Sequence, residues 1–173
     1  KNVATIPGSQ ERVEFAIILP GQSEGNTVYL PIDAKFPQED YIRLCEAGEN
    51  SDIHAAEAAQ RALRERIKTE AQRIHSKYIS APYTTDFGIL YLPVEGLYAE
   101  IARQAELTEY IQRQYRIIIA GPTTLTALLN SLQMGFATLA IQKRSSEVWE
   151  VLGAFKAEFR KFEEILQKTK KKL

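Results

Sequence analysis

Two short apolar runs stand on either side of a polar segment near the start of the chain. Residues 13–19 and 28–32 are rich in β-branched and aromatic side chains, and residues 21–26 contain two glycines, a serine and an asparagine. Runs of this length and composition favour β-strands, and the polar segment is typical of a turn. The pattern therefore predicts a β-hairpin, which restricts the fold of everything that follows it.

The register of this hairpin brings charged residues together. A turn centred between positions 23 and 24, the middle of the polar segment, pairs Glu14 with Asp33 across the two strands. Directly opposed residues have Cβ atoms roughly 5 Å apart. Residues two apart on a strand share a face, so Lys35 projects on the same side as Asp33. We therefore expect two carboxylates and one amine to converge at one end of the hairpin.

The order of elements after the hairpin indicates an α/β fold. Apolar residues at spacings of three and four predict a long helix over 53–78, after a shorter helix over 36–46. Continuous apolar runs predict buried strands at 87–92 and 116–120, with a helix over 97–114 between them. Strands that alternate with helices pair in parallel through right-handed crossovers. The hairpin and the parallel strands, with their flanking helices, form the predicted core.

The C-terminal part is predicted to be helical. A helix over 123–141 precedes a long helix that begins near residue 145. In the long helix, apolar residues alternate four and three apart, which is a heptad seam suited to a helical partner. We expect an α/β core over 1–144 and a C-terminal helix over 145–173, which packs on the core or forms a homo-oligomer. The seam consists of Val148, Leu152, Phe155, Phe159, Phe162 and Leu166.

Composition limits the class of protein. The chain has 22 basic and 22 acidic residues, a net charge of zero, which argues against a protein that coats nucleic acid through a large positive field. Cys45 is the only cysteine, so no disulfide forms within the chain, and no apolar run is long enough to cross a bilayer. These features favour a cytoplasmic protein without a membrane partner. Because the sequence starts at Lys1 rather than Met, we expect a segment of a longer protein.

The expected convergence of Glu14, Asp33 and Lys35 can be interpreted in two ways. Adjacent carboxylates repel each other unless a cation lies between them, and oxygen ligands suit Mg²⁺ or Mn²⁺ better than zinc. Such a metal would polarise a phosphodiester and activate water, and the Lys35 ammonium would orient that water or stabilise developing charge. The alternative is a structural ion pair between Glu14 and Lys35 on an exposed face.

Further candidates come from topology and charge. If the later strands are parallel to the Asp33 strand, Glu95 and the turn before Thr123 and Thr124 share its edge. The two threonines either bind a DNA phosphate at a helix start or simply cap that helix. Glu95 is either a third acid or a charge that favours the start of its helix. The cations proposed to contact phosphates, with surface solubility as the alternative, are Lys68, Arg73, Lys77, Lys143 and Arg144.

Six segments of the chain resemble the RmuC family of DNA recombination proteins, which is similar to PD-(D/E)XK nucleases. They occur in family order and together extend over nearly the whole chain from residue 11. The segments are R-V-E-F-A-I-I-L-P at 12–20, L-P-I-D-A-K-F-P at 30–37, T-T-D-F at 84–87, L-P-V-E-G-L-Y at 92–98, A-G-P-T-T-L at 120–125 and N-S-L-Q-M-G at 130–135.

The resemblance implies a restriction-endonuclease-like core and assigns roles to the hairpin residues. Glu14 takes the first acidic position of the nuclease motif, Asp33 the second and Lys35 the lysine; Glu14 and Asp33 would bind the metal. Val13-Glu14 stands where the family often has Pro-Asp, which changes the reach to a metal by about one methylene. Family members also carry an acidic residue on an upstream helix and a long coiled coil, so we expect the catalytic set in this sequence to be incomplete.

Two functions remain open from the sequence. One is a metal-dependent DNA endonuclease domain of recombination or repair, with Mg²⁺ or Mn²⁺ as cofactor. The other is a non-catalytic DNA-binding or scaffold module that keeps the nuclease fold. A small-molecule phosphotransferase is disfavoured because neither phosphate-binding glycine motif, G-x-x-x-x-G-K-[ST] or G-x-G-x-x-G, is present.

Overall fold

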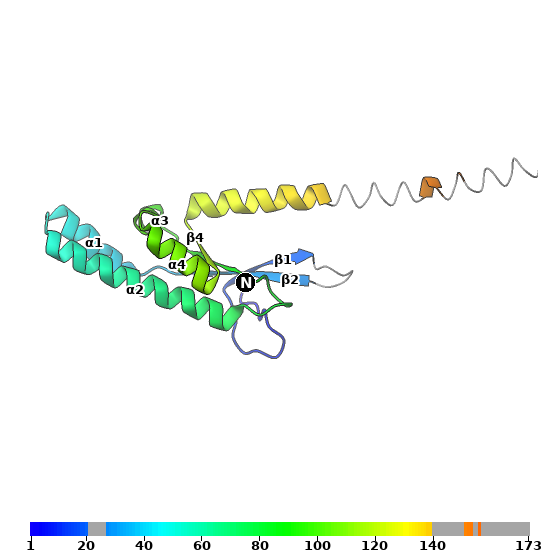
Figure 1. Cartoon of the computed structure of the whole chain (residues 1–173), viewed down its shortest axis with the longest axis horizontal. Coiled ribbons are helices and arrows are strands. Elements are labelled where there is room, and N and C mark those ends of the chain that lie inside the picture. The colour runs from blue at the N-terminus through cyan, green and yellow to red at the C-terminus, as the bar shows by residue number, and fades with distance from the viewer. Residues whose placement is uncertain (21–26, 140–150, 154–155, 157–173) are drawn as a thin grey trace, which may run out of the picture. The chain divides into compact units, whose positions relative to one another are not determined.

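The computed structural model describes residues 1–20, 27–139, 151–153 and 156 (Figure 1). The chain divides into two compact units, residues 1–126 and residues 127–173. The first unit contains the sheet, the helices α1 to α4 and the charged residues at the end of the hairpin. The predicted boundary at residue 144 falls outside the described residues and stays a prediction.

A mixed four-stranded sheet forms the centre of the first unit. The strands β1 (Phe15–Pro20), β2 (Thr27–Ala34), β3 (Gly88–Tyr91) and β4 (Ile117–Ala120) lie side by side in that order. β1 is antiparallel to β2, whereas β2, β3 and β4 are parallel. This confirms the α/β class, the hairpin and the parallel pairing of the later strands.

The hairpin has the predicted register. Phe15 is opposite Ile32 and Pro20 is opposite Thr27, so the pairing is symmetric about the midpoint between positions 23 and 24. A register shift of one residue would move every side chain to the other face of the sheet. The apolar side chains Leu30 and Ile32 would then exchange places with Asp33, which explains why one register is specified.

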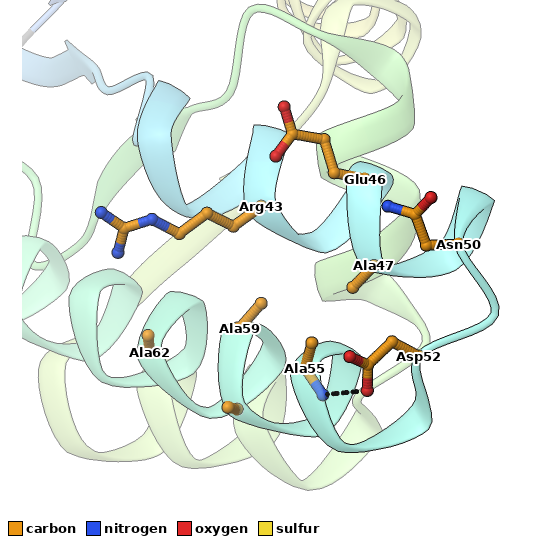
Figure 2. Close-up of a pocket in the computed structure, with 9 residues that line it drawn as sticks. Arg43, Glu46, Ala47, Asn50, Asp52, Ala55, Ala59 and Ala62 are labelled. Atoms are coloured by element: carbon orange, nitrogen blue, oxygen red, sulfur yellow. Dashed lines mark hydrogen bonds between the residues drawn. The ribbon is translucent and has the colours of Figure 1, made fainter.

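The helices α1 (Gln38–Glu49) and α2 (Ile53–Tyr78) lie side by side (Figure 1). Asp52 caps α2, because its side chain accepts a hydrogen bond of 2.9 Å from the Ala55 N–H (Figure 2). An open cavity of about 450 Å³ lies between the two helices, with alanine side chains on α2 and polar side chains at its rim. Its lining residues are Arg43, Glu46, Ala47, Asn50, Asp52, Ala55, Ala58, Ala59 and Ala62.

The single helix predicted over 97–114 is wrong, since the structure has two helices there. They are α3 (Glu95–Ala102) and α4 (Ala105–Tyr115). The buried residues Leu97 and Ile101 are four apart, as are Leu107 and Ile111, but Ile101 and Leu107 are six apart. A spacing of six does not continue one helical stripe, so a second helix has to begin with a new orientation.

One hydrophobic core joins the helices to the sheet. The α2 residues Leu63, Ile67 and Ile74 are fully buried against Leu90 of β3 and Ile117 of β4. The core also includes Leu92 and the buried residues of α3 and α4. Burial of each such side chain stabilises the fold by about 1.5–3 kcal/mol. This packing fixes α2 across the face of the sheet that carries Leu90.

The turn after β4 packs closely against α3. A Cβ atom at Gly121 would lie 2.7 Å from the Tyr98 ring, so a larger residue does not fit there. Residues 122–139 are helical, in agreement with the predicted helix, whose last two positions lie outside the described residues. Of the predicted seam, Leu152 lies in the helical stretch 151–153, and the other five residues are outside the described parts. No described helix is both long and apolar enough to span a bilayer.

Candidate active site

Asp33 lies at the C-terminal end of β2 and is 2% exposed. It is paired with Leu90, so its side chain projects toward the face on which α2 packs. The backbone N–H of Lys35 donates to the Tyr91 carbonyl at 2.9 Å, which extends the parallel pairing one residue beyond the strand. The Lys35 Nζ atom lies 2.5 Å from Asp33 Oδ2 as an ion pair. The backbone thus fixes both groups where the parallel strands end.

The surroundings of Asp33 disfavour its negative charge. Burial raises the pKa of Asp33, Lys35 lowers it, and the charges of Glu14 and Glu70 raise it further, with a raised pKa as the net result. Burial disfavours the Lys35 ammonium as well, but contact with Asp33 outweighs this effect and raises the pKa of Lys35. Asp33 Oδ2 has no hydrogen-bond partner of good geometry apart from this ion pair. The Lys35 ion pair therefore only partly offsets the burial of the Asp33 carboxylate.

Glu14 immediately precedes β1 and reaches across the hairpin. Its Oε2 atom accepts a hydrogen bond of 3.3 Å from the Ala34 N–H, next to Asp33. The preceding residue, Val13, is fully buried and exchanges two backbone hydrogen bonds with Val3, which holds this end of the hairpin. The structure therefore brings Glu14, Asp33 and Lys35 together as expected. The ion pair of Lys35 is formed with Asp33 rather than with Glu14.

A second cavity of about 450 Å³ opens between the end of β2 and α2. Carboxylates and cationic side chains face this cavity, together with the phenol of Tyr78. Burial and the charge of Asp33 raise the pKa of that phenol. We call it the charged cavity, in contrast to the alanine cavity between α1 and α2. Its lining residues are Asp33, Lys35, Glu70, Arg73, Ile74, Lys77 and Tyr78.

Glu70 is a site residue that the sequence analysis missed. It lies on α2, is 7% exposed and contacts Arg73 at 3.3 Å. A signal was present in the sequence, because Glu70 stands three residues after Ile67 and four before Ile74. This position belongs to the buried stripe of the helix. A carboxylate on an otherwise apolar stripe indicates a group that is buried for a reason other than packing.

The cations predicted to bind phosphate lie in different parts of the structure. Arg73 and Lys77 line the charged cavity, and Lys77 Nζ contacts both carboxylate oxygens of Glu11 at 3.0 Å. Lys68 lies elsewhere on α2, where it contacts Glu65 at 2.8 Å and stands 5.7 Å from the centre of the Tyr110 ring. Lys143 and Arg144 are outside the described residues.

Glu95 and Thr123 meet at the sheet edge where the parallel strands end. The Thr123 N–H donates a hydrogen bond of 3.3 Å to Glu95 Oε2. Glu95 therefore interacts with the start of the helix at 122–139, and it is absent from the lining of the charged cavity. A phosphate at Thr123 would have to displace this carboxylate. Phosphate binding by Thr123 and by the neighbouring Thr124 stays a prediction.

The site offers carboxylate oxygens for a hard cation, but few of them. Within the described residues, no three or more Asp, Glu, His or Cys side chains are arranged to hold a metal ion. Mg²⁺ commonly binds through one or two carboxylates and retains several waters, so a full protein cage is unnecessary. The buried Asp33 Oδ2 atom, whose one partner is the Lys35 ammonium, fits this type of site.

Comparison with known proteins identifies the family. The model of the RmuC family matches residues 1–173. The chain belongs to the RmuC family. Two curated proteins of Xylella fastidiosa, from strains Temecula1 and 9a5c, are each 51% identical to it and are described as DNA recombination protein RmuC homologues. The alignments include the whole chain but 38% of each relative. No solved structure matches the fold.

Proposed function

We propose that this RmuC chain is the nuclease-like part of a DNA recombination or repair protein, and that it hydrolyses phosphodiester bonds with Mg²⁺ or Mn²⁺. The description of the Xylella relatives as DNA recombination proteins supports DNA as the partner. The arrangement of an antiparallel hairpin followed by parallel strands is consistent with a restriction-endonuclease-like core. We propose that the protein acts in the cytoplasm and forms homo-oligomers through the C-terminal heptad seam.

The buried Asp33 carboxylate beside Lys35 is the observation that carries this proposal. A carboxylate with a raised pKa in a cavity lined by cations is a recurrent feature of catalytic sites. The same pair in a purely structural role would be a costly way to stabilise the fold, because both groups lose solvation.

Each residue has a role in this proposal. Asp33 would hold the metal, which when bound polarises the phosphodiester and lowers the pKa of a coordinated water. Glu14 holds the end of the hairpin through Ala34 and adds negative charge beside Asp33. Lys35 stays protonated, so it orients the attacking water or stabilises negative charge on the phosphorus oxygens. Arg73 and Lys77 would bind the substrate phosphates at the wall of the cavity.

A cleavage assay tests the proposal. Purified chain is incubated with linear and branched DNA in Mg²⁺, in Mn²⁺ or with a chelator, alongside the Asp33→Asn variant. We expect metal-dependent products that disappear in the variant and in the chelator. The same assay on a protein with the full length of the curated relatives tests whether further residues complete the site.

The second candidate is a non-catalytic DNA-binding module. It is favoured by the Asp33–Lys35 ion pair, in which the carboxylate already has a cation as its partner. This function predicts salt-sensitive DNA binding without cleavage, and no change in DNA binding in the Asp33→Asn variant.

A further inference from the structure

Glu70 is one of two buried carboxylates that face the charged cavity. Asp33 is 2% exposed and Glu70 is 7% exposed, although they come from different elements, the end of β2 and the middle of α2. Burial of a carboxylate is unfavourable unless a cation compensates its charge. Two of them at one cavity need more compensation than either alone.

The protein compensates these two charges only in part. Lys35 pairs with Asp33 through Oδ2, and that buried oxygen has no further hydrogen-bond partner. Arg73 contacts Glu70 at 3.3 Å, and its own side chain is 60% exposed. Ion pairs with a largely exposed guanidinium contribute little. The charge of Glu70 also reaches Asp33, because it contributes to the raised pKa of that carboxyl.

We propose that Glu70 and Asp33 together hold the divalent cation, so that α2 supplies a metal ligand opposite the one on β2. This inference rests on the proposed metal-dependent function. Two carboxylates completed by water molecules satisfy the octahedral preference of Mg²⁺. Mn²⁺ accepts the same oxygen ligands.

The arrangement gives Glu14 a different role from the one its sequence position implies. Glu14 Oε2 accepts a hydrogen bond from the Ala34 N–H, and Glu14 is absent from the lining of the cavity. Glu14 therefore positions the end of β2, whereas Glu70 faces the cavity in which a phosphate and a metal would meet. A metal held by Glu70 would replace Arg73 as the partner of this carboxylate and leave Arg73 available to the substrate phosphate.

Mn²⁺ binding, measured by isothermal titration calorimetry on the whole chain, tests this inference with a matched control. Glu65 and Glu70 are both on α2, and each contacts a cation three residues further on. The Glu65 side chain is 68% exposed, whereas that of Glu70 is 9% exposed. We expect Glu70→Gln to weaken Mn²⁺ binding at least about tenfold and Glu65→Gln to change it less than about twofold.

The outcomes separate this inference from the proposed function. If Asp33→Asn abolishes Mn²⁺ binding and Glu70→Gln leaves it unchanged, the role of Glu70 is wrong and the metal-dependent function stands. If neither the unmodified chain nor a protein with the full length of the curated relatives binds Mn²⁺ or cleaves DNA, both fail. Thermal unfolding with and without Mn²⁺ provides a second readout, because a bound ligand raises the melting temperature. The metal-induced rise should be smaller in Glu70→Gln and in Glu70→Asp, which keeps the charge but shortens the reach, and unchanged in Glu65→Gln.

Discussion

The charged cavity and the alanine cavity each have a volume of about 450 Å³, and both are bordered by α2. They differ in where their polar groups lie. In the alanine cavity the buried residues are Ala47 and Ala59, whereas the ionisable side chains at its rim are exposed. In the charged cavity the buried residues include Asp33 and Glu70.

This difference shows which feature of a cavity indicates a catalytic or binding function. Exposed charges at a rim keep most of their hydration and need no compensation. Buried carboxylates have lost it, and the fold tolerates their free-energy cost where a function requires it. Volume does not distinguish the two cavities, but the burial of their carboxylates does. Substitutions matched between the cavities can therefore break or sharpen the comparison.

The largest expected effect comes from Lys35→Met. The substitution removes the ammonium beside Asp33 and keeps the length of the side chain. We expect DNA cleavage in Mg²⁺ to fall about a hundredfold or more, because a cation that stabilises the transition state is lost. Mn²⁺ binding should be retained, since repulsion from the ammonium is removed. Arg43→Met at the rim of the alanine cavity is the control and should cleave normally; equal losses in both variants would contradict the assignment of Lys35.

Asp33→Asn should stabilise the chain while it removes cleavage. Because the pKa of Asp33 is raised by folding, the folded state holds its proton more tightly than the unfolded state does. Ionised Asp33 therefore costs stability above its folded pKa, and this cost vanishes as the pH falls below the unfolded pKa near 3.9. We expect a gain of roughly 1 kcal/mol at pH 7 in urea unfolding, which shrinks toward pH 4. A variant less stable than the unmodified chain at pH 7 would show that the Lys35 contact dominates.

Ala59→Leu should also stabilise the chain, but without an effect on function. The added side chain extends into the alanine cavity and buries apolar surface between α1 and α2. Filling a cavity in this way contributes about 1 kcal/mol, which corresponds to a rise of about 2–4 °C in melting temperature. Calorimetric melting and the cleavage assay check both parts. A loss of cleavage would show that the alanine cavity has a functional role.

The smallest expected effect is on DNA affinity. Glu11→Gln releases Lys77 from its two carboxylate contacts, so this cation becomes available to a phosphate. We expect binding of fluorescent DNA at low salt to strengthen about threefold, with a steeper dependence on salt concentration. Glu39→Gln is the matched control, because Glu39 lies 3.9 Å from Arg43 of the alanine cavity. Equal gains in both variants would indicate a general charge effect.

Parts of the fold were predictable because a local pattern determined them. The period of two in the hairpin and its symmetric turn gave the register that pairs Phe15 with Ile32. The continuous stripe of α2 gave its bounds at Ile53 and Tyr78. The break between α3 and α4 was missed because it is marked only by the irregular spacing from Ile101 to Leu107.

The site was predictable to the extent that it lies on one hairpin. Glu14, Asp33 and Lys35 are brought together by strand register, which sequence spacing encodes. Glu70 reaches the same cavity only through packing of α2 against the sheet, and no local pattern describes that packing. Which acid contacts Lys77 depends likewise on tertiary structure, since Glu11 is 66 residues away in the chain.

Anomalous X-ray scattering from crystals soaked in Mn²⁺ tests the central claim most directly. We predict one strong peak in the charged cavity, about 2.0–2.3 Å from a carboxylate oxygen of Asp33, and its loss in Asp33→Asn. The absence of a peak at Asp33 in soaked crystals with an accessible cavity, or a peak at the acidic rim of the alanine cavity instead, would contradict the account.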